Sequence, residues 1–303
     1  MINMTDFQQQ IKVALPNTEF RFQEPMSRHT SFRIGGPVEA MAFPKTPCEL
    51  SELLKQSALL DCKPAILGAG TNILAPDDGI SGLVICLKDC MDGIEHLSGE
   101  RIRVAAGVTM TRAAVFAAGK GLGGFEFAHG IPGTVGGGVY MNAGAYGGEI
   151  ADVCETVDIM SMDGTVTTVP AEKMGFSYRH SRLEEENGIV VSAVFKLNKA
   201  DPVQIRSVMQ ELMNRRKASQ PLDLPSAGSA FKRPVGGFAA ALIEQAGLKG
   251  FRVGDAGISE KHAGFAVNLG NATAAEVKSL LERVSAIVKE KSGIKLEPEV
   301  RIW

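Results

Sequence analysis

The sequence predicts a protein of about two domains that contains both helices and strands. Its 303 residues correspond to about two domains of average size. Segments with helical spacing of apolar residues alternate with segments of strand spacing up to about residue 196. A long helical segment without glycine begins near residue 200, so we place a domain boundary at 197–200.

The composition limits what the protein binds and where it works. Hydrophobic residues make up 45% and charged residues 22% of the chain, as in ordinary globular proteins. A net charge of −2 gives no bulk attraction to nucleic acid or to an anionic membrane. No run approaches the roughly 18 apolar residues of a membrane span, and the N-terminus lacks a signal-peptide pattern. The five cysteines form no C-x-x-C motif, so we expect reduced thiols, no metal site and a cytoplasmic protein.

The N-terminal part of the chain carries regular patterns of both kinds. Thr5 and Gln8 match a capping box at the start of a short helix. Apolar residues within 27–44 follow strand spacing, and 47–60 has the pattern of an amphipathic helix. The segment 64–87 then predicts a strand, a glycine loop, a short apolar stretch, a turn and a second strand.

Strands dominate the middle of the chain. Residues 101–107 predict a strand, and 109–124 predict a helix that ends at glycines. Asp163-Gly164 between two apolar runs is a strong hairpin signal. A further strand is predicted at 187–198.

Helices and strands also alternate beyond the boundary. The predicted helices cover 201–218, 237–248 and 274–291, and the predicted strands cover 251–259, 262–270 and 294–303. Thr273 and Glu276 form a second capping box before the last helix. Pro298 interrupts the final strand.

Two glycine-rich loops carry the strongest functional signal. Residues 129–148 contain eight glycines among interleaved apolar residues, which favours an ordered ligand-binding loop over a flexible linker. In chain order, residues 129–148 form the second glycine loop. The first glycine loop, 67–72, lacks the G-x-G-x-x-G fingerprint of a dinucleotide fold, and no long helix can follow it. Its backbone N–H groups, with Thr71 and Asn72, suit a pyrophosphate. A plain turn at the end of a strand explains this loop equally well.

Three further segments hold residues that can do chemistry. They are 175–182 with Tyr178, Arg179, His180 and Arg182; 225–234 with Ser226, Ser229, Lys232 and Arg233; and 296–303 with Glu297 and Glu299. Taken one at a time, each segment is explained better by solvated charges or by a turn.

Taken together and in order, these segments resemble the UDP-N-acetylenolpyruvoylglucosamine reductase (MurB) family of flavoenzymes. The resemblance extends from about residue 25 to the end and includes H-G-I-P-G-T-V-G-G-G, G-S-A-F-K and E-P-E-V-R. Thr71 replaces a serine common in the family, and Arg233 replaces a common asparagine. The short helical interval 197–219 resembles the subgroup that lacks an extra tyrosine-bearing loop.

The resemblance implies an α+β fold. An N-terminal helical segment, 1–28, would precede a two-lobed FAD-binding domain of the PCMH/vanillyl-alcohol-oxidase type at 29–196. A smaller α+β substrate-binding domain would occupy 197–303, with its final strand returning to the active site. FAD would be bound non-covalently, because 64–76 contain neither histidine nor cysteine for attachment. The sequence does not determine the oligomeric state; a monomer is expected.

The implied reaction belongs to peptidoglycan synthesis and thus to cell-wall biogenesis. NADPH reduces FAD, which then passes hydride to the enolpyruvyl ether of a UDP-sugar, giving UDP-N-acetylmuramate. Arg179 and Glu299 map onto the family's residues around the developing enolate, and Ser229 maps onto its proton donor. Strand alternation puts Glu297 on the same face as Glu299, so only the family motif favours Glu299.

The implied binding residues fall into two sets. The cofactor-binding residues are Gly68, Ala69, Gly70, Thr71, Asn72, Gly130, Ile131, Pro132, Gly133, Thr134, Gly137, Asn142 and Gly144. The candidate contacts for the UDP moiety are Lys217, Gln220, Lys232 and Arg233. A structural role explains His262 better than a ligand contact does. The alternatives are another flavin oxidoreductase of this domain type and a nucleotide-binding module without catalysis.

Overall fold

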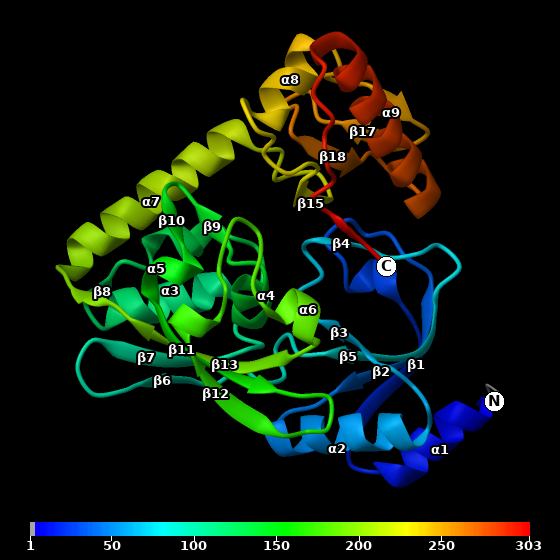
Figure 1. Ribbon diagram of the computed structural model, residues 1–303, viewed down its shortest axis with the longest axis vertical. Coiled ribbons are helices and arrows are strands. Elements are labelled where there is room, and N and C mark those ends of the chain that lie inside the picture. Colours follow the sequence, from blue (N-terminus) through cyan, green and yellow to red (C-terminus); the bar gives the residue numbers. More distant parts are fainter. Residues whose placement is uncertain (1–3) are drawn as a thin grey trace. The chain divides into compact units, whose positions relative to one another are not determined.

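The computed structural model describes residues 4–303, which form two compact units (Figure 1). The first unit comprises the described residues up to Phe22, with Glu39–Ala69 and Gly82–Asn214, and the second comprises Gln23–Val38, Gly70–Ser81 and Arg215–Trp303. Two N-terminal segments therefore fold with the C-terminal part of the chain, and the units differ from the predicted domains 1–28, 29–196 and 197–303. Those domain boundaries stay a prediction, and residues 1–3 lie outside the described residues.

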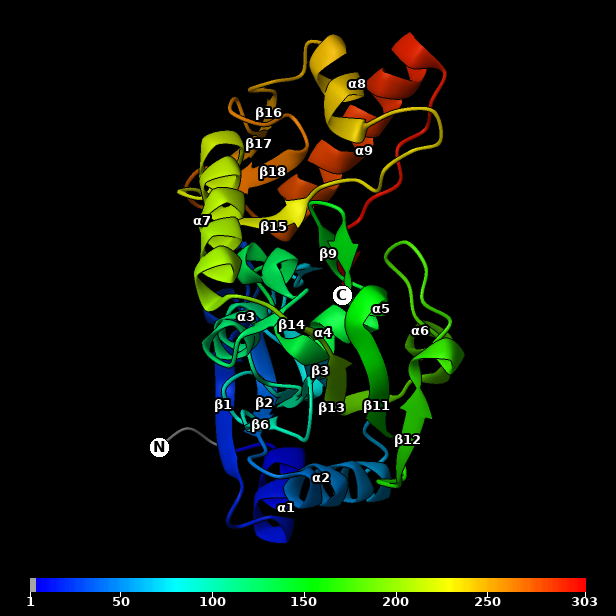
Figure 2. The same ribbon diagram turned by 90° about the vertical axis from the view of Figure 1, so that its left-hand side faces the viewer.

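One sheet of the first unit has the strand order β1-β2-β5-β3. Its strands are β1 (Glu19–Pro25), β2 (Pro37–Phe43), β5 (Ile80–Cys86) and β3 (Ala65–Leu67). Helices α1 (Asp6–Ala14) and α2 (Pro47–Leu59) lie side by side at one end of this unit (Figure 2). Thr5 and Gln8 form the predicted capping box of α1. Parallel pairing of β3 with β5 fixes the point at which the 67–72 loop leaves the sheet.

The other large sheet of this unit is antiparallel, with the order β12-β11-β13-β7-β6. Its strands are β12 (Val166–Pro170), β11 (Cys154–Met160), β13 (Ile189–Lys196), β7 (Arg101–Ala105) and β6 (Ile94–His96). The predicted turn at Asp163-Gly164 joins β11 to β12, with Gly164 at a φ of 86°. Strand β13 is buried except at Lys196, since α4 (Val135–Tyr140) packs against it.

The remaining elements of the first unit are mostly short. They are β8 (Leu122–Gly123), η2 (Glu126–Gly130), β9 (Gly144–Ala145), β10 (Gly148–Glu149), α5 (Ile150–Val153), η3 (Ala171–Lys173), α6 (Leu183–Glu186) and β14 (Asn198–Lys199). Helix α3 (Met110–Gly119) ends at the predicted glycines. Helix α7 (Pro202–Ser219) crosses the division between the units. None of the helices within residues 4–303 has the length and apolar character of a membrane span.

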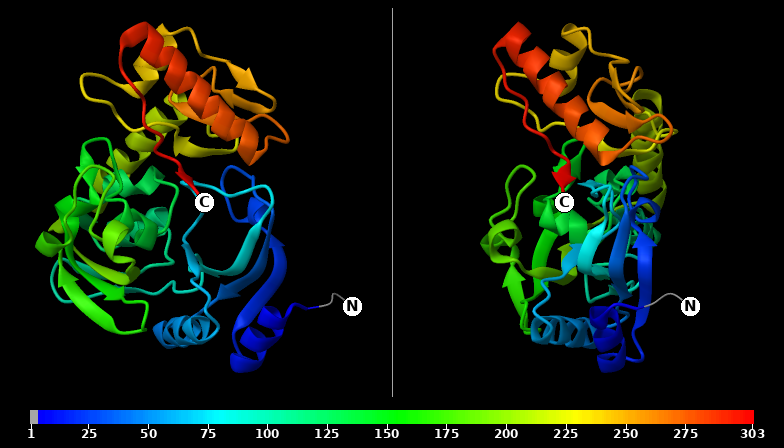
Figure 3. Two further views of the ribbon diagram at one scale, coloured as in Figure 1. Left: turned by 45° about the vertical axis from the view of Figure 1, so that its right-hand side comes forward. Right: turned by 90° about the vertical axis from the view of Figure 1, so that its right-hand side faces the viewer.

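The second unit has its own core around a four-stranded antiparallel sheet of order β15-β18-β17-β16. Its strands are β15 (Ser226–Ser229), β18 (Phe265–Asn268), β17 (Ala256–Ile258) and β16 (Arg252–Val253), and its helices are η1 (Met26–Arg28), α8 (Ala239–Gln245) and α9 (Ala274–Ser292). Helix α9 packs against β16 and β17 (Figure 3). It begins at the predicted Thr273–Glu276 capping box and ends at Gly293, at a φ of 75°. Leucine and valine side chains at helical spacing bury one face of α9.

The end of the chain differs from the predicted strand at 294–303. Only β19 (Arg301–Ile302) is a strand, and it pairs in parallel with β4 (Ile73–Leu74) of the same unit. Pro298 makes a single bridge to Phe231. Because proline has no N–H to donate, regular pairing stops there. The last residues thus lie beside both the segment after the 67–72 loop and the segment after Ser229.

Candidate functional site

The two predicted glycine loops meet within the first unit. Gly68 follows β3, and a Cβ atom placed on it would lie 2.6 Å from Thr134 Oγ1. Thr134 is buried, and its hydroxyl accepts a hydrogen bond of 3.3 Å from the Gly137 N–H at the start of α4. Two loops that are far apart in the sequence therefore bring their predicted cofactor-binding residues together.

Several glycines of the second loop serve packing rather than ligand approach. The structure shows the short helix α4 where the sequence predicts a loop. A Cβ on Gly136 would lie 2.9 Å from Ala106 Cβ, and a Cβ on Gly138 would lie 2.8 Å from Met110 Sδ. Gly137 differs, because a Cβ there would meet only Thr134 Oγ1, at 3.6 Å. The protein itself therefore leaves room at Gly137, which fits the close approach of a ligand.

The 67–72 loop keeps hydrogen-bond donors available. Among the described residues, no backbone hydrogen bond of a turn or loop is donated by the N–H groups from Ala69 to Asn72. Such a run of N–H groups suits an anion, and the open face at Gly137 suits a flat ligand. The residues present thus fit FAD, with its pyrophosphate and its ring system.

His129, at the start of the second glycine loop, was not among the predicted site residues. Its Nδ1 atom is buried and has no partner within residues 4–303, while Thr111 donates a 2.6 Å hydrogen bond to its carbonyl oxygen. Burial lowers the pKa of His129, so the ring is neutral near pH 7. The signal available in the sequence was its place directly before G-I-P-G.

Asn142 links the second glycine loop to the segment of Arg179. Asn142 is fully buried; its Nδ2 donates to the Ser177 carbonyl at 3.0 Å, and its Oδ1 accepts from the Ala151 N–H at 2.9 Å. Ser181 donates to the Tyr140 carbonyl at 2.8 Å. The side chain of Asn142 is thus engaged with protein, and its contact with the flavin stays a prediction.

Arg179 lies at the tip of a tight turn in the first unit. Ser177 and His180 exchange backbone hydrogen bonds of 3.2 Å across it. Arg179 has a φ of 57°, a conformation that costs a non-glycine residue roughly 1–3 kcal/mol when the structure imposes it. Its guanidinium carbon lies 5.0 Å from the centre of the Tyr178 ring. Strain of this kind is common at functional sites.

The second unit brings together three predicted residues from distant segments. Ser229 ends β15, and the next residue, Ala230, accepts a 2.9 Å hydrogen bond from the Glu299 N–H. Asn72 Nδ2 donates to the Glu299 carbonyl at 3.2 Å. Asn72, Ser229 and Glu299 therefore share one neighbourhood. Arg179 belongs to the first unit, and its grouping with Ser229 and Glu299 stays a prediction.

The two glutamates near the C-terminus have different surroundings. Glu297 Oε1 lies 2.5 Å from Lys232 Nζ, and its side chain is 70% exposed. Glu299 is only partly exposed. Neither glutamate lies within a strand, so the strand alternation that placed both on one face does not apply to this segment. The two carboxylates therefore differ in their surroundings, which strand alternation could not predict. Glu297 forms an ordinary surface ion pair with Lys232.

The candidate residues for the UDP moiety all belong to the second unit, and each has a local protein contact. The Lys217 carbonyl accepts from Lys261 Nζ at 2.7 Å, and Gln220 Oε1 accepts from Arg216 Nη1 at 3.2 Å. The Arg233 guanidinium carbon lies 4.1 Å from the centre of the Phe238 ring.

His262 behaves as a structural residue. Its Nδ1 accepts from the Gly264 N–H at 3.1 Å, and its ring packs edge-on against Phe265. Burial lowers the pKa of His262, which keeps the ring neutral near pH 7.

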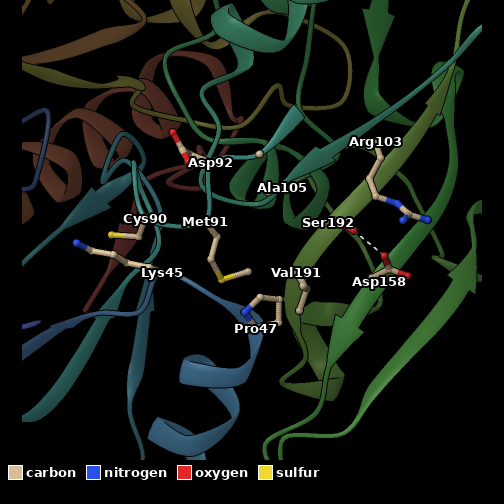
Figure 4. A pocket seen from close by; sticks show the side chains of 11 residues that line it. Lys45, Pro47, Cys90, Met91, Asp92, Arg103, Ala105, Asp158, Val191 and Ser192 are labelled. Carbon is tan, nitrogen blue, oxygen red and sulfur yellow. Dashed lines mark hydrogen bonds between the residues drawn. The ribbon is translucent and has the colours of Figure 1, made fainter. Parts of the chain in front are cut away.

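A separate pocket of about 360 Å³ lies in the first unit (Figure 4). Lys45 and Cys90 lie on one side of it, and Asp158 and Ser192 lie on the other. Ser192 donates to Asp158 at 2.6 Å. The pocket lining includes none of the predicted site residues. No cluster of three or more metal-ligating side chains occurs in the part of the chain that the structure describes.

Gly137→Val is expected to abolish retention of the flavin that the resemblance implies, while the chain still folds. The added side chain meets little of the protein but occupies the face open to a ligand. Flavin absorbance per purified chain measures retention, and circular dichroism measures folding. Gly138→Val is the contrasting variant: its side chain would collide with Met110, so it should lower the unfolding temperature. Full flavin occupancy in folded Gly137→Val would show that this face does not contact the cofactor.

Comparison with known proteins identifies the same family that the ordered sequence motifs resemble. Residues 38–170 match the family model of an FAD binding domain, and residues 220–303 match the C-terminal domain of UDP-N-acetylenolpyruvoylglucosamine reductase. The reductase of Lactococcus lactis is 43% identical over 100% of this chain and 99% of its own length, and that of Caldanaerobacter subterraneus is 44% identical over 96% of each. The crystal structure of the Thermus caldophilus reductase (MurB) is 37% identical, with a TM-score of 0.80 over 95% of this chain and 99% of that one. The predicted α+β fold with an FAD-binding domain is confirmed, and the chain belongs to the UDP-N-acetylenolpyruvoylglucosamine reductase (MurB) family.

Proposed function

We propose that this chain is an NADPH-dependent flavoenzyme that reduces the enolpyruvyl ether of UDP-N-acetylglucosamine-enolpyruvate to UDP-N-acetylmuramate. The observation that carries the proposal is the neighbourhood of Ser229 and Glu299, joined by the hydrogen bond from the Glu299 N–H to the Ala230 carbonyl. A hydroxyl-bearing residue and a carboxyl-bearing residue on neighbouring segments suit a reaction that must deliver a proton and stabilise an enolate. The enzyme would act in the cytoplasm, as a monomer, in peptidoglycan synthesis.

The first glycine loop and Thr134 would hold the pyrophosphate of FAD, and the face of α4 at Gly137 would lie against the cofactor. When bound, FAD supplies the hydride chemistry, and NADPH is the hydride donor. The absence of histidine and cysteine from 64–76 supports non-covalent binding. Thr134 would position the loop and the helix together, because its hydroxyl is already bonded to the Gly137 N–H.

Three side chains would act on the substrate. Arg179 presents two parallel donors that match the carboxylate of the enolpyruvyl group. Glu299, in its protonated form, would donate a hydrogen bond to the developing enolate oxygen. The hydroxyl of Ser229 would deliver the proton to the carbon next to the one that receives hydride. Lys217, Gln220, Lys232 and Arg233 are the proposed contacts of the UDP moiety.

Anaerobic rapid mixing of the wild-type enzyme tests the function. NADPH should bleach the flavin band, and the enolpyruvyl UDP-sugar should restore it with formation of UDP-N-acetylmuramate. UDP-N-acetylglucosamine, which lacks the enolpyruvyl group, is the control and should not restore the band. Rapid reoxidation by oxygen with release of peroxide, and no response to the enolpyruvyl substrate, would instead identify an oxidase of this domain type. Flavin that NADPH cannot reduce would favour a binding module.

Ser229→Ala should slow reoxidation of the reduced flavin by the enolpyruvyl substrate at least a hundredfold. A positioned general acid contributes about 10² to 10⁴ in rate, or roughly 3–5 kcal/mol of barrier. Flavin content and reduction by NADPH should stay near the wild-type values, because neither needs this proton. Ser226→Ala, in the same strand, is the matched control and should reduce the reoxidation rate only slightly. Reoxidation of Ser229→Ala at the wild-type speed would rule out Ser229 as the proton donor.

A further inference from the structure

The segment 233–238, between β15 and α8, presents two large apolar side chains to solvent. We call it the 233–238 loop. Val235 is 97% exposed and Phe238 is 59% exposed. Gly236 has a φ of 84°, and a Cβ on Gly236 or Gly237 would meet nothing within 4 Å. The core of the second unit therefore does not use this loop, and its surroundings leave space for a ligand.

The guanidinium group of Arg233 lies over the ring of Phe238. The guanidinium carbon of Arg233 lies 4.1 Å from the centre of the Phe238 ring, within the range of a cation–π contact. The contact holds a cation next to an aromatic ring that remains more than half exposed. Lys232 directly precedes Arg233, and Lys232 donates its backbone N–H to the Glu297 carbonyl at 2.8 Å. The loop thus starts at an anchored point near Ser229 and Glu299.

A nucleoside diphosphate combines the two properties that this pair can recognise. Its base is flat and stacks on aromatic rings, and each stacked base contributes about 1–3 kcal/mol as measured by alanine substitution. Its phosphates are anions that a guanidinium binds with two parallel hydrogen bonds. An exposed phenylalanine without a neighbouring cation could stack on the base but could not bind the phosphates.

We propose that Phe238 is the stacking platform for the uracil of the UDP-sugar, with Arg233 held beside it to bind the diphosphate. This inference rests on the proposed function and names the residue that recognises the base. The exposed ring of Phe238 then covers the base in the complex.

Calorimetric titration of the FAD-loaded enzyme with UDP and with inorganic pyrophosphate tests the proposal. Phe238→Ala should weaken UDP binding about tenfold or more, the size expected from one stacked base. Pyrophosphate binding should not change, because pyrophosphate has no base. Phe238→Tyr should keep the wild-type affinity for UDP, since it keeps the ring. Val235→Ala is the control from the same loop and should change neither affinity.

The outcomes separate this inference from the function on which it rests. Unchanged UDP affinity in Phe238→Ala would overturn the stacking role. Equal weakening of UDP and pyrophosphate would also overturn it, because the phenylalanine would then act only by holding Arg233. Wild-type enzyme that binds neither UDP nor the enolpyruvyl UDP-sugar would contradict the proposed function itself. Flavin absorbance and reduction by NADPH in every variant verify that the fold is intact.

Discussion

The close approach of Gly68 to Thr134 is the constraint on which the proposed cofactor site depends. Gly68 directly follows strand β3 of one sheet, and Thr134 is the N-cap of α4, which packs on β13 of the other sheet of the same unit. Any side chain at position 68 would compete for the space of the Thr134 hydroxyl. That hydroxyl accepts a hydrogen bond from the Gly137 N–H in the first turn of α4. The glycine thus lets the ends of elements from two sheets lie close together, and the proposed binding of the flavin depends on this junction.

A second set of contacts organises the residues proposed to act on the substrate. The chain returns at its end to Asn72 and Ile73, through the Asn72–Glu299 hydrogen bond and the pairing of β19 with β4. Ser31 adds a hydrogen bond of 2.6 Å to the Ser226 carbonyl at the start of β15. Segments from the N-terminal half therefore support the strand of Ser229. This arrangement explains why two short segments, 23–38 and 70–81, are compact with the C-terminal part of the chain.

Local signals in the sequence predicted local structure well, and tertiary contacts decided the rest. The capping boxes at Thr5 and Thr273 and the Asp163-Gly164 turn depend on a few neighbouring residues, and the structure contains all of them. Helix α4 was not predicted, because glycine is a poor helix former in isolation. It forms here because Gly136 and Gly138 allow close packing on Ala106 and Met110.

In the candidate site, too, motifs in the sequence predicted some features and tertiary contacts determined the others. The ordered motifs predicted both glycine loops, and these loops do meet. Alternation could not separate Glu297 from Glu299, since it assumed a strand that Pro298 prevents. The exposed stack of Arg233 on Phe238 was also missed, because exposure is a property of the folded chain and not of the motif. The roles of these residues depend on contacts between segments far apart in the sequence.

The FAD affinity of Gly68→Ala tests the central claim most directly. The added methyl group would lie 2.6 Å from Thr134 Oγ1, so either the two loops separate or Thr134 loses its bond to α4. We expect the dissociation constant for FAD to rise at least tenfold, about 1.4 kcal/mol, in a chain that keeps its fold. Gly119→Ala is the matched control, because a Cβ there meets nothing within 4 Å. Wild-type FAD affinity in Gly68→Ala would contradict the account, since the junction of the two loops would then not form the cofactor site.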